Sequence, residues 1–320
     1  MAKVLVVGPI HEDGIKLLEA RDDVDYEVVD GDLAELAAKI VDADGVTMRT
    51  SPLPAAVIER AERLKVVSRH GVGYDNIDVD TLTRRGIPLA IAADANATAV
   101  AEHTLYFMLA LAKQGLRYDR ATREGRWAMR NSLEAVDLLG RRVLVMGFGR
   151  IGREVAKRCA AFGMAVMIYD PYVQANVIEA AGPWRSVPDF RAVLSETDVL
   201  TVHMPLGADS RGLIGRAELE ALPAHAFVIN AARGGIVDER ALHDALTSGQ
   251  IAGAALDVFE EEPPPENHPL FALDNVILTP HSAGMSKEAA IRMAISTARN
   301  VLAGIDGKLD PTMVVNREVL

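Results

Sequence analysis

The fold is decided by the stretch Arg142-Val-Leu-Val-Met-Gly147-Phe-Gly149-Arg-Ile-Gly152-Arg-Glu-Val-Ala-Lys157, which predicts a short apolar strand, a glycine-rich turn and the start of a helix. In this order, the G-x-G-x-x-G spacing is typical of dinucleotide-binding sheets. Gly147 permits a tight turn, Gly149 lets the backbone approach a pyrophosphate, and Gly152 lets the helix pack closely on the strand. The alternative is a glycine-rich turn in an unrelated α/β protein.

The residues around this turn favour NAD over NADP. The next apolar run ends at Asp170, whose carboxylate can accept hydrogen bonds from a ribose diol and would repel a 2′-phosphate. No Arg or Lys occurs in residues 171–175. The N–H groups of Arg150 and Ile151, at the start of the helix, are expected to face the anion of the cofactor. Alternatively, Asp170 only caps a turn before Pro171.

Short apolar runs alternate with helix-length stretches along the whole chain, which indicates parallel sheets covered by helices. The second part of the chain carries six such runs, enough for a complete dinucleotide-binding sheet. The runs are residues 4–7, 45–48, 64–68 and 88–92 in the first part, and 143–146, 165–169, 199–203, 226–230, 252–256 and 276–279 in the second. We therefore expect an α/β fold with two Rossmann-like or flavodoxin-like parallel-sheet domains and a cleft between them.

Two helix patterns define the expected domains. Residues 97–112 predict a long, mostly buried helix that links the domains. Residues 287–302 predict an amphipathic helix that a six-stranded sheet does not need, so it could return to the first unit. We expect a discontinuous substrate domain, residues 1–97 and 283–320, around an NAD-binding domain of residues 98–282.

Composition excludes several classes of protein. The 320 residues are 49% hydrophobic and carry a net charge of −11 spread along the chain, which disfavours nucleic acid as a partner. Neither a signal-peptide layout nor an apolar run of membrane-spanning length occurs, so we expect a cytoplasmic protein without a membrane partner. The single cysteine, Cys159, is expected to pack on the buried side of a helix and to have no chemical role. No metal site is expected.

Three polar loops follow apolar runs of the second part, where ligands of such sheets bind. Arg233, in Asn-Ala-Ala-Arg-Gly-Gly, offers a guanidinium suited to bidentate capture of a carboxylate. Glu262, directly before Pro263, offers a carboxylate, and His281, in Thr-Pro-His-Ser, offers an imidazole. We expect these three side chains to act together, and we expect His103 and His203 to be hydrogen-bonded structural residues or residues that support the site from behind.

These motifs resemble those of the D-isomer-specific 2-hydroxyacid dehydrogenases and, within that family, of the phosphoglycerate dehydrogenases. The resemblance rests on residues 230–239 (Asn-Ala-Ala-Arg-Gly-Gly-Ile-Val-Asp-Glu) and 253–264 (Gly-Ala-Ala-Leu-Asp-Val-Phe-Glu-Glu-Glu-Pro-Pro). It extends over nearly the whole chain, from residues 69–78 (Arg-His-Gly-Val-Gly-Tyr-Asp-Asn-Ile-Asp) to the final helix.

The resemblance implies reversible hydride transfer between NAD(H) and a 2-hydroxy or 2-oxo carboxylate, with 3-phosphoglycerate as one candidate. It implies that Arg233 binds and polarises the substrate and that His281 gives or takes the proton. It also implies that Glu262 pairs with His281 and raises its pKa. The cofactor contacts that it implies are Met204, Ala231, Ala232 and Asp257, and the substrate contacts are Arg49, Arg69, Val72 and Gly73 in addition to Arg233.

Other implications concern assembly and regulation. Trp127 is expected to anchor a homodimer, the alternative being packing within the chain. Val72 stands where phosphoglycerate dehydrogenases often have threonine, and Met129 where a cation often follows the tryptophan; Arg130 is a candidate to replace that cation. Regulation by serine is not expected, because a chain ending at Leu320 has no room for the regulatory domain of the long forms.

Three alternatives to this function remain open. The substrate could be another acid used within the family, such as hydroxypyruvate or glyoxylate. Formate dehydrogenase, a relative whose substrate loses no hydroxyl proton, would not require Glu262. An NAD-sensing binding protein, resembling the corepressors that share this fold, would not turn over substrate at all. Whether Arg49 and Arg69 bind an anionic group of the substrate is equally open, because Arg69 could instead pair with Asp75 or Asp78.

Overall fold

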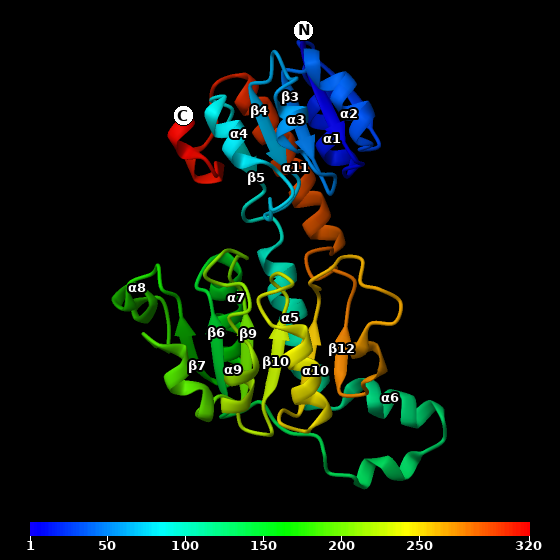
Figure 1. Cartoon of the computed structure of the whole chain (residues 1–320), viewed down its shortest axis with the longest axis vertical. Helices are drawn as coiled ribbons and strands as arrows, with labels where there is room; N and C mark the ends of the chain where they lie inside the picture. Colours follow the sequence, from blue (N-terminus) through cyan, green and yellow to red (C-terminus); the bar gives the residue numbers. More distant parts are fainter. The chain divides into compact units, whose positions relative to one another are not determined.

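The computed structural model describes residues 1–320 as two compact units, each built around its own parallel sheet. The first unit combines residues 1–96 with residues 285–320, and the second unit comprises residues 97–284 (Figure 1). None of the helices combines the length and apolarity that a membrane span requires. The predicted α/β class, with two parallel sheets, is confirmed.

The sheet of the first unit has five parallel strands in the order β2-β1-β3-β4-β5. Its strands are β1 (Ala2–Val7), β2 (Val24–Val29), β3 (Gly45–Met48), β4 (Val66–Arg69) and β5 (Leu89–Ile91). Its helices are α1 (Glu12–Glu19), α2 (Leu33–Lys39), α3 (Ala55–Ile58), α4 (Val79–Arg84) and α11 (Lys287–Ile305), with 3-10 turns η1 (Ile40–Asp42), η5 (Pro311–Met313) and η6 (Arg317–Val319). Helix α11 packs on α1, β3 and β4.

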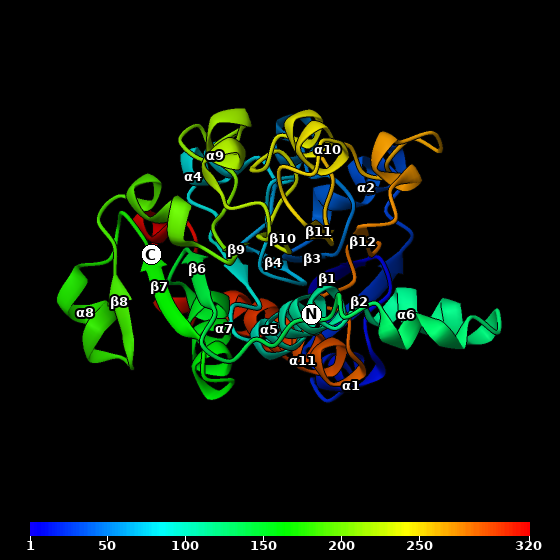
Figure 2. The same cartoon turned by 90° about the horizontal axis from the view of Figure 1, so that it is seen from below.

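Both faces of this sheet are covered, which explains why its central strands are largely apolar. Val6 packs with Leu18 of α1 and Val301 of α11, whereas the next residue, Val7, packs with Leu36 of α2. In Figure 2, α1 and α11 lie on one side of the sheet and α2 and α4 on the other. Because successive side chains point to opposite faces, most positions of a central strand are apolar, and Thr47 and Ser68 are the buried polar exceptions in β3 and β4.

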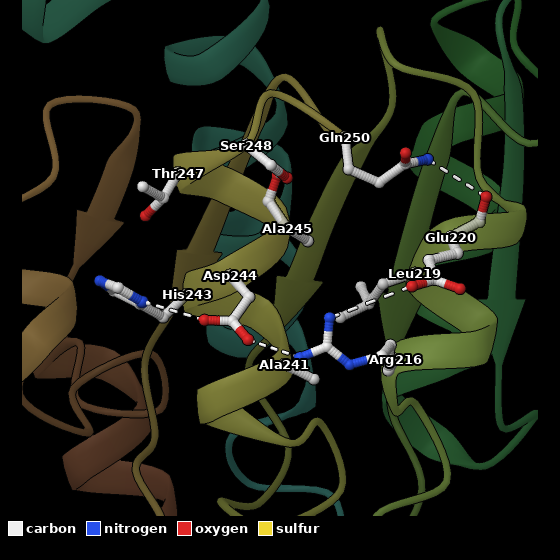
Figure 3. A pocket seen from close by; sticks show the side chains of 10 residues that line it. All are labelled: Arg216, Leu219, Glu220, Ala241, His243, Asp244, Ala245, Thr247, Ser248 and Gln250. Atoms are coloured by element: carbon white, nitrogen blue, oxygen red, sulfur yellow. Dashed lines mark hydrogen bonds and ion pairs between the residues drawn. The ribbon is translucent and has the colours of Figure 1, made fainter.

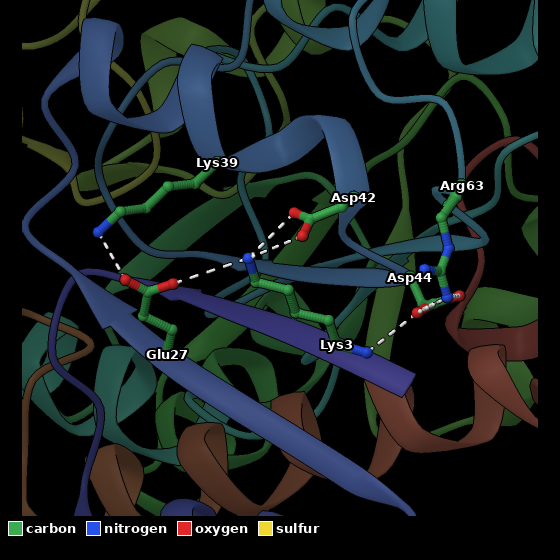
Figure 4. Close-up of polar contacts among 6 residues, drawn as sticks. All are labelled: Lys3, Glu27, Lys39, Asp42, Asp44 and Arg63. Atoms are coloured by element: carbon green, nitrogen blue, oxygen red, sulfur yellow. Dashed lines mark hydrogen bonds and ion pairs between the residues drawn. The ribbon is translucent and has the colours of Figure 1, made fainter. Parts of the chain in front are cut away.

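Ion pairs and hydrogen bonds of charged side chains join neighbouring segments of this unit (Figure 4). The Nζ atom of Lys39 lies 2.6 Å from Glu27 of β2. Asp44, directly before β3, accepts hydrogen bonds from the N–H of Lys3 at 2.9 Å and from Nη2 of Arg63 at 2.9 Å. Burial raises the pKa of Asp44, but these partners outweigh burial and hold the pKa below its ordinary value.

The sheet of the second unit has seven parallel strands in the order β12-β11-β10-β9-β6-β7-β8. The strands are β6 (Arg142–Met146), β7 (Ala165–Tyr169), β8 (Trp184–Ser186), β9 (Val199–Val202), β10 (Phe227–Asn230), β11 (Gly253–Leu256) and β12 (Val276–Leu278). The strand order reverses between β6 and β9, and ligands of such sheets bind outside the carboxyl ends of strands at this point.

Helices cover both faces of the second sheet. They are α5 (Ala97–Ala112), α6 (Gly115–Arg123), α7 (Arg150–Ala161), α8 (Ala175–Ala180), α9 (Arg216–Ala221) and α10 (Glu239–Thr247), with 3-10 turns η2 (Trp127–Asn131), η3 (Phe190–Glu196) and η4 (Pro269–Ala272). Helices α5 and α7 lie on one face, and α9 and α10 on the other (Figure 2). The buried helix predicted at residues 97–112 is confirmed as α5. Helix α6 and η2 project from the unit as an arm (Figure 1).

Two strands were absent from the prediction, and both lie at a sheet edge. The first unit gains β2, Val-Asp-Tyr-Glu-Val-Val, of which only the two end residues are buried. The second unit gains β8, Trp-Arg-Ser, so the prediction of six strands was wrong. An edge strand pairs on one side only and is less covered, so it lacks the continuous apolar run that marks a central strand.

Candidate active site

The glycine-rich turn between β6 and α7 has the geometry of a dinucleotide loop. Gly147 has a φ of +101°, and a Cβ there would lie 2.6 Å from the carbonyl oxygen of His203. A Cβ on Gly152 would lie 2.0 Å from the carbonyl oxygen of Gly147. A Cβ on Gly149 would instead meet no atom within 4 Å. Packing therefore requires the outer two glycines, and the middle one faces open space.

The surroundings of this turn fit a pyrophosphate. Gly149 is the N-cap of α7 and supplies no side-chain cap, so the start of this helix, at Arg150 and Ile151, can turn backbone N–H groups toward an anion. The backbone of the loop is held from behind, because Nε of Arg153 donates to the carbonyl of Phe148 at 3.0 Å. The residues present therefore fit the phosphates of a dinucleotide.

Asp170 stands at the carboxyl end of β7, beside this turn. One carboxylate oxygen accepts from the N–H of Phe148 at 2.7 Å, and the other accepts from the N–H of Tyr172 at 2.9 Å. The side chain thus caps the turn at Pro171 and also ties that turn to the glycine loop. Its contact with a ribose stays a prediction.

The loop after β10 carries Arg233. Asn230 braces the loop, since its side chain donates to the carbonyl of Arg233 at 2.8 Å and accepts from the N–H of Ala232 at 3.0 Å. Nη1 of Arg233 donates to the carbonyl of Ala232 at 2.7 Å. A Cβ on Gly234 would lie 1.8 Å from the carbonyl oxygen of Phe259, so the backbone of this loop rests directly on the next one.

The structure joins the predicted acid and imidazole. Nδ1 of His281 lies 2.7 Å from Oε2 of Glu262, and Oε1 of Glu262 accepts from the N–H of Phe259 at 3.0 Å. Their side chains are 49% and 36% exposed, so a ligand can reach the pair.

The electrostatics of Glu262 keep it ionised. Burial raises its pKa, but the hydrogen bonds from His281 and Phe259 and the charges of His281 and Arg233 outweigh burial and hold the pKa below its ordinary value. An ionised carboxylate only accepts hydrogen bonds, so Nδ1 of His281 carries the proton of this contact. Arg233, Glu262 and His281 therefore form one electrostatic group.

His281 is held in an uncommon backbone conformation with a φ of +50°. Its N–H donates to the carbonyl of Asp257 at 2.8 Å. The buried carboxylate of Asp257 accepts from the N–H groups of Ser282 and Ala283, each at 2.8 Å, and from the hydroxyl of Thr279. Asp257 therefore anchors the loop that presents His281, and its predicted contact with the nicotinamide stays a prediction.

Sequence reasoning missed two braces of the site, Asn230 and Thr279. Asn230 ends the buried strand β10 and Thr279 directly follows the edge strand β12, and this position at the carboxyl end of a strand was the signal that could have found them. Nε2 of His103 lies 3.1 Å from the hydroxyl of Thr279. His103 therefore contacts a residue that braces the loop of His281, which agrees with the expectation of a supporting role.

His203 and Cys159 are also structural. Nε2 of His203 lies 2.9 Å from the hydroxyl of Thr201, and burial lowers the pKa of His203 to about 3. Cys159 is buried against Met108 in the core of the second unit, and burial raises its pKa to about 12. The expectation that Cys159 packs within a helix is confirmed.

The other predicted cofactor contacts lie close to the glycine turn. Met204 follows β9, and its N atom would be 3.1 Å from a Cβ on Gly147. Ala231 is buried and packs with Val100 and Ile151, and Ala232 is half-buried. Their contact with the cofactor stays a prediction.

The predicted substrate residues of the first unit make contacts of their own. Nε of Arg69 donates to the carbonyl of Gly73 at 2.7 Å, and Nη1 donates to the carbonyls of Met48 and His70 at 3.1 and 3.0 Å. Arg69 thus braces the loop that contains the half-buried Val72 and Gly73. Nη1 of Arg49 reaches the carbonyl of Pro9 at 3.3 Å.

Trp127 lies on the projecting arm and is 67% exposed. The guanidinium of Arg130 stands 6.0 Å from the centre of its ring. The alternative that Trp127 packs inside the chain is therefore wrong.

A pocket between α9 and α10 is separate from these residues (Figure 3). Arg216 of α9 pairs with Asp244 of α10 across it, and Gln250 donates to the carbonyl of Glu220 at 3.1 Å. None of the predicted site residues lines this pocket. Its charged side chains pair with each other, so it offers no chemistry of its own.

Comparison with known proteins identifies the family. Residues 105–283 match the NAD-binding domain of the D-isomer specific 2-hydroxyacid dehydrogenases. The chain is 42% identical over 316 residues to D-3-phosphoglycerate dehydrogenase of Methanocaldococcus jannaschii, and the match covers 98% of the chain and 59% of that relative. It is 38% identical over 325 residues to glyoxylate reductase of Thermofilum pendens, covering 99% of the chain and 95% of that relative.

A solved structure agrees with these matches. D-lactate dehydrogenase of Aquifex aeolicus, in complex with NAD and lactic acid, superposes with a TM-score of 0.88 at 27% identity, covering 98% of the chain and 99% of that protein. The second unit is thus an NAD-binding domain. The chain belongs to the D-isomer-specific 2-hydroxyacid dehydrogenase family.

Proposed function

We propose that the chain is an NAD-dependent dehydrogenase that interconverts a D-2-hydroxy acid and its 2-oxo acid. The hydrogen bond of 2.7 Å between Glu262 and His281 is the observation that carries this proposal. An acid–base pair of this kind, next to a guanidinium, suits proton transfer to an oxygen of a bound carboxylate. A binding protein that only senses NAD needs no such pair.

Each residue of the group has a distinct proposed task. Arg233 binds the substrate carboxylate and polarises its carbonyl. Glu262 holds Nδ1 of His281, which leaves Nε2 as the atom that gives a proton to the developing alkoxide or takes one from the hydroxyl. NAD, when bound, supplies the hydride chemistry, and we propose that Gly147, Gly149, Gly152, Met204, Ala231, Ala232, Asp170 and Asp257 surround it.

We propose that the substrate bears a second anionic group, with phosphohydroxypyruvate and 3-phosphoglycerate as the candidates. Arg49 and Arg69 are the proposed ligands of that group, and the backbone of Val72 and Gly73 those of the carboxylate. Each charge-assisted hydrogen bond contributes about 1.5–3 kcal/mol. The second candidate substrates are glyoxylate and hydroxypyruvate, which the engagement of Arg69 with three backbone carbonyls favours.

A panel of 2-oxo acids with NADH tests the function and separates these substrates. We expect turnover, and we expect kcat/KM for phosphohydroxypyruvate to exceed that for hydroxypyruvate by about tenfold or more, as one charge-assisted hydrogen bond would give. A preference for the unphosphorylated acid would show that the protein does not recognise a phosphate group, and it would favour glyoxylate and hydroxypyruvate as substrates. The absence of turnover on every acid would overturn the enzymatic function itself.

Cofactor choice is a separate prediction, in which NADH is preferred over NADPH because the carboxylate of Asp170 repels a 2′-phosphate. Asp170→Asn removes the charge and keeps one acceptor oxygen, so it should relax the preference at the cost of one of the two hydrogen bonds from the N–H groups of Phe148 and Tyr172. The ratio of kcat/KM values for the two cofactors measures this. Equal use of both cofactors by the unchanged protein would contradict the prediction.

Further proposals concern organisation. We propose that the first unit is the substrate domain of the protein. We also propose a homodimer in which Trp127 is an anchor, a proposal supported by the exposure of its ring on the arm of the second unit. The cytoplasmic location stays a prediction.

A further inference from the structure

A second glutamate–histidine pair, Glu239 and His268, lies in the same unit as Glu262 and His281. Nε2 of His268 stands 2.9 Å from Oε2 of Glu239. Unlike Glu262 and His281, this pair is largely buried, because the side chain of His268 is 10% exposed and that of Glu239 is 13% exposed. Neither residue has a task in the chemistry proposed above. A buried polar pair is costly unless its hydrogen bonds are satisfied, so its contacts indicate what it does.

Glu239 contacts the loop that carries Glu262. Oε1 of Glu239 accepts from the N–H of Glu260 at 2.7 Å, and Oε1 of Glu260 accepts from the N–H of Glu239 at 3.2 Å. These reciprocal bonds tie the first turn of α10 to residues 259–262. Because Glu239 follows the helix N-cap Asp238, its backbone belongs to a rigid element.

His268 secures the same loop from the other side. Its ring stacks edge-on against Phe259, with centroids 5.6 Å apart, and it packs on Phe271 at 5.3 Å. The N–H of Leu270 donates to Nδ1 of His268 at 3.4 Å, so the proton on Nε2 is the one donated to Glu239. The imidazole thus joins η4, α10 and Phe259.

Phe259 connects this assembly to the reacting groups. Its N–H donates to Oε1 of Glu262 at 3.0 Å, and its carbonyl lies where a Cβ on Gly234 would come within 1.8 Å. A displacement of Phe259 would therefore move the carboxylate that holds His281 and would also disturb the loop of Arg233.

We propose that Glu239 and His268 are positioning residues, which fix residues 259–262 so that the carboxylate of Glu262 meets Nδ1 of His281. This inference rests on the proposed function. A pair buried in the protein keeps its geometry better than a loop exposed to water, and a misplacement of about 1 Å can lower turnover about 100-fold.

Glu239→Ala tests the inference, because it removes both oxygens at once. We expect kcat on the preferred 2-oxo acid to fall about 10- to 100-fold, with KM for NADH unchanged within about twofold. The pH profile of kcat should shift, since His281 loses its fixed partner. Glu239→Gln keeps an acceptor for the N–H of Glu260 but turns an NH2 donor toward Nε2 of His268, so it should restore only part of the activity. Glu261→Ala, in the same loop but exposed, is the matched control and should leave kcat unchanged.

A double-mutant cycle with Glu262→Gln decides whether Glu239 acts through Glu262. In the Glu262→Gln background, Glu239→Ala should lower kcat by clearly less than it does in the unsubstituted protein, because the position of that carboxylate no longer matters and only the contact of Phe259 with the Arg233 loop remains. Additive losses would overturn the inference, as would an unchanged pH profile. Inactivity of the unsubstituted protein on all 2-oxo acids would instead overturn the proposed function.

An activity-independent measurement completes the test. The Nδ1 proton of His281, hydrogen-bonded to Glu262, is expected to give a downfield NMR signal that weakens in Glu239→Ala and persists in Glu261→Ala. If Glu239→Ala does not fold, His268→Asn serves instead, since it keeps a donor near Glu239 but loses the ring that packs on Phe259. Retention of the signal and of full kcat in either variant would refute the positioning role.

Discussion

Replacing His281 by Asn is expected to lower turnover at least about 100-fold while leaving the dissociation constant of NADH within about twofold of its original value. The imidazole is the proposed proton donor, and an amide cannot replace it in that task. Asn is preferable to Ala because His281 has a φ of +50°. Among residues other than glycine, Asn is one of those that adopt this left-handed conformation most readily. The substitution therefore removes the chemistry and preserves the loop.

Single-turnover and steady-state rates with NADH, together with a direct NADH titration, measure this effect. His243→Asn is a matched control, because His243 lies on α10 and lines only the pocket beside α9. Near-normal turnover by His281→Asn would show that the proposed mechanism is wrong. Loss of NADH binding would show instead that the substitution had damaged the cofactor site.

The pH behaviour of Glu262 supports the same interpretation. Since its pKa is depressed in the folded protein, the pair stabilises the fold above the ordinary carboxyl pKa, and this contribution is lost as the pH falls through the depressed value. At neutral pH, Glu262 is thus ionised and holds Nδ1 of His281. In the proposed mechanism, Glu262 orients His281 and stabilises its charge, whereas the proton that moves is at Nε2.

The site was predictable where chemistry requires a particular residue type in a particular place. Gly147 and Gly152 are fixed by backbone atoms that a Cβ would strike, so their spacing is visible in the sequence. The pairing of Glu262 with His281 was inferred from family resemblance and from the loops that follow parallel strands, and the structure places the two atoms at hydrogen-bond distance.

What escaped prediction depends on contacts between residues far apart in the chain. Asp257 was expected to touch the nicotinamide, yet its buried carboxylate is engaged by Thr279, Ser282 and Ala283, more than twenty positions away. Similarly, no sequence pattern near Glu239 predicts its hydrogen bond with His268. Edge strands β2 and β8 were missed for a different reason, since their partial exposure removes the apolar signal.

Arg233→Lys is expected to have the second large effect, a fall in kcat/KM for the 2-oxo acid of about 100-fold or more. Two charge-assisted hydrogen bonds join a guanidinium to a carboxylate in a planar fork, and each contributes about 1.5–3 kcal/mol. A lysine keeps the charge but offers only a compact point charge on a flexible stem, so it cannot reproduce both bonds.

The surroundings of Arg233 make this substitution informative. Asn230 and Gly234 hold the loop through backbone contacts that do not involve the guanidinium, so the loop should keep its shape in the variant. We therefore expect KM for the 2-oxo acid to rise and kcat to fall, while the dissociation constant of NADH stays within about twofold. Arg216→Lys, which alters an exposed arginine paired with Asp244 on the far pocket, is the control and should be without effect. If Arg233→Lys retained kcat/KM within about fivefold, a single charge would suffice, and bidentate capture of the substrate carboxylate would have to be abandoned.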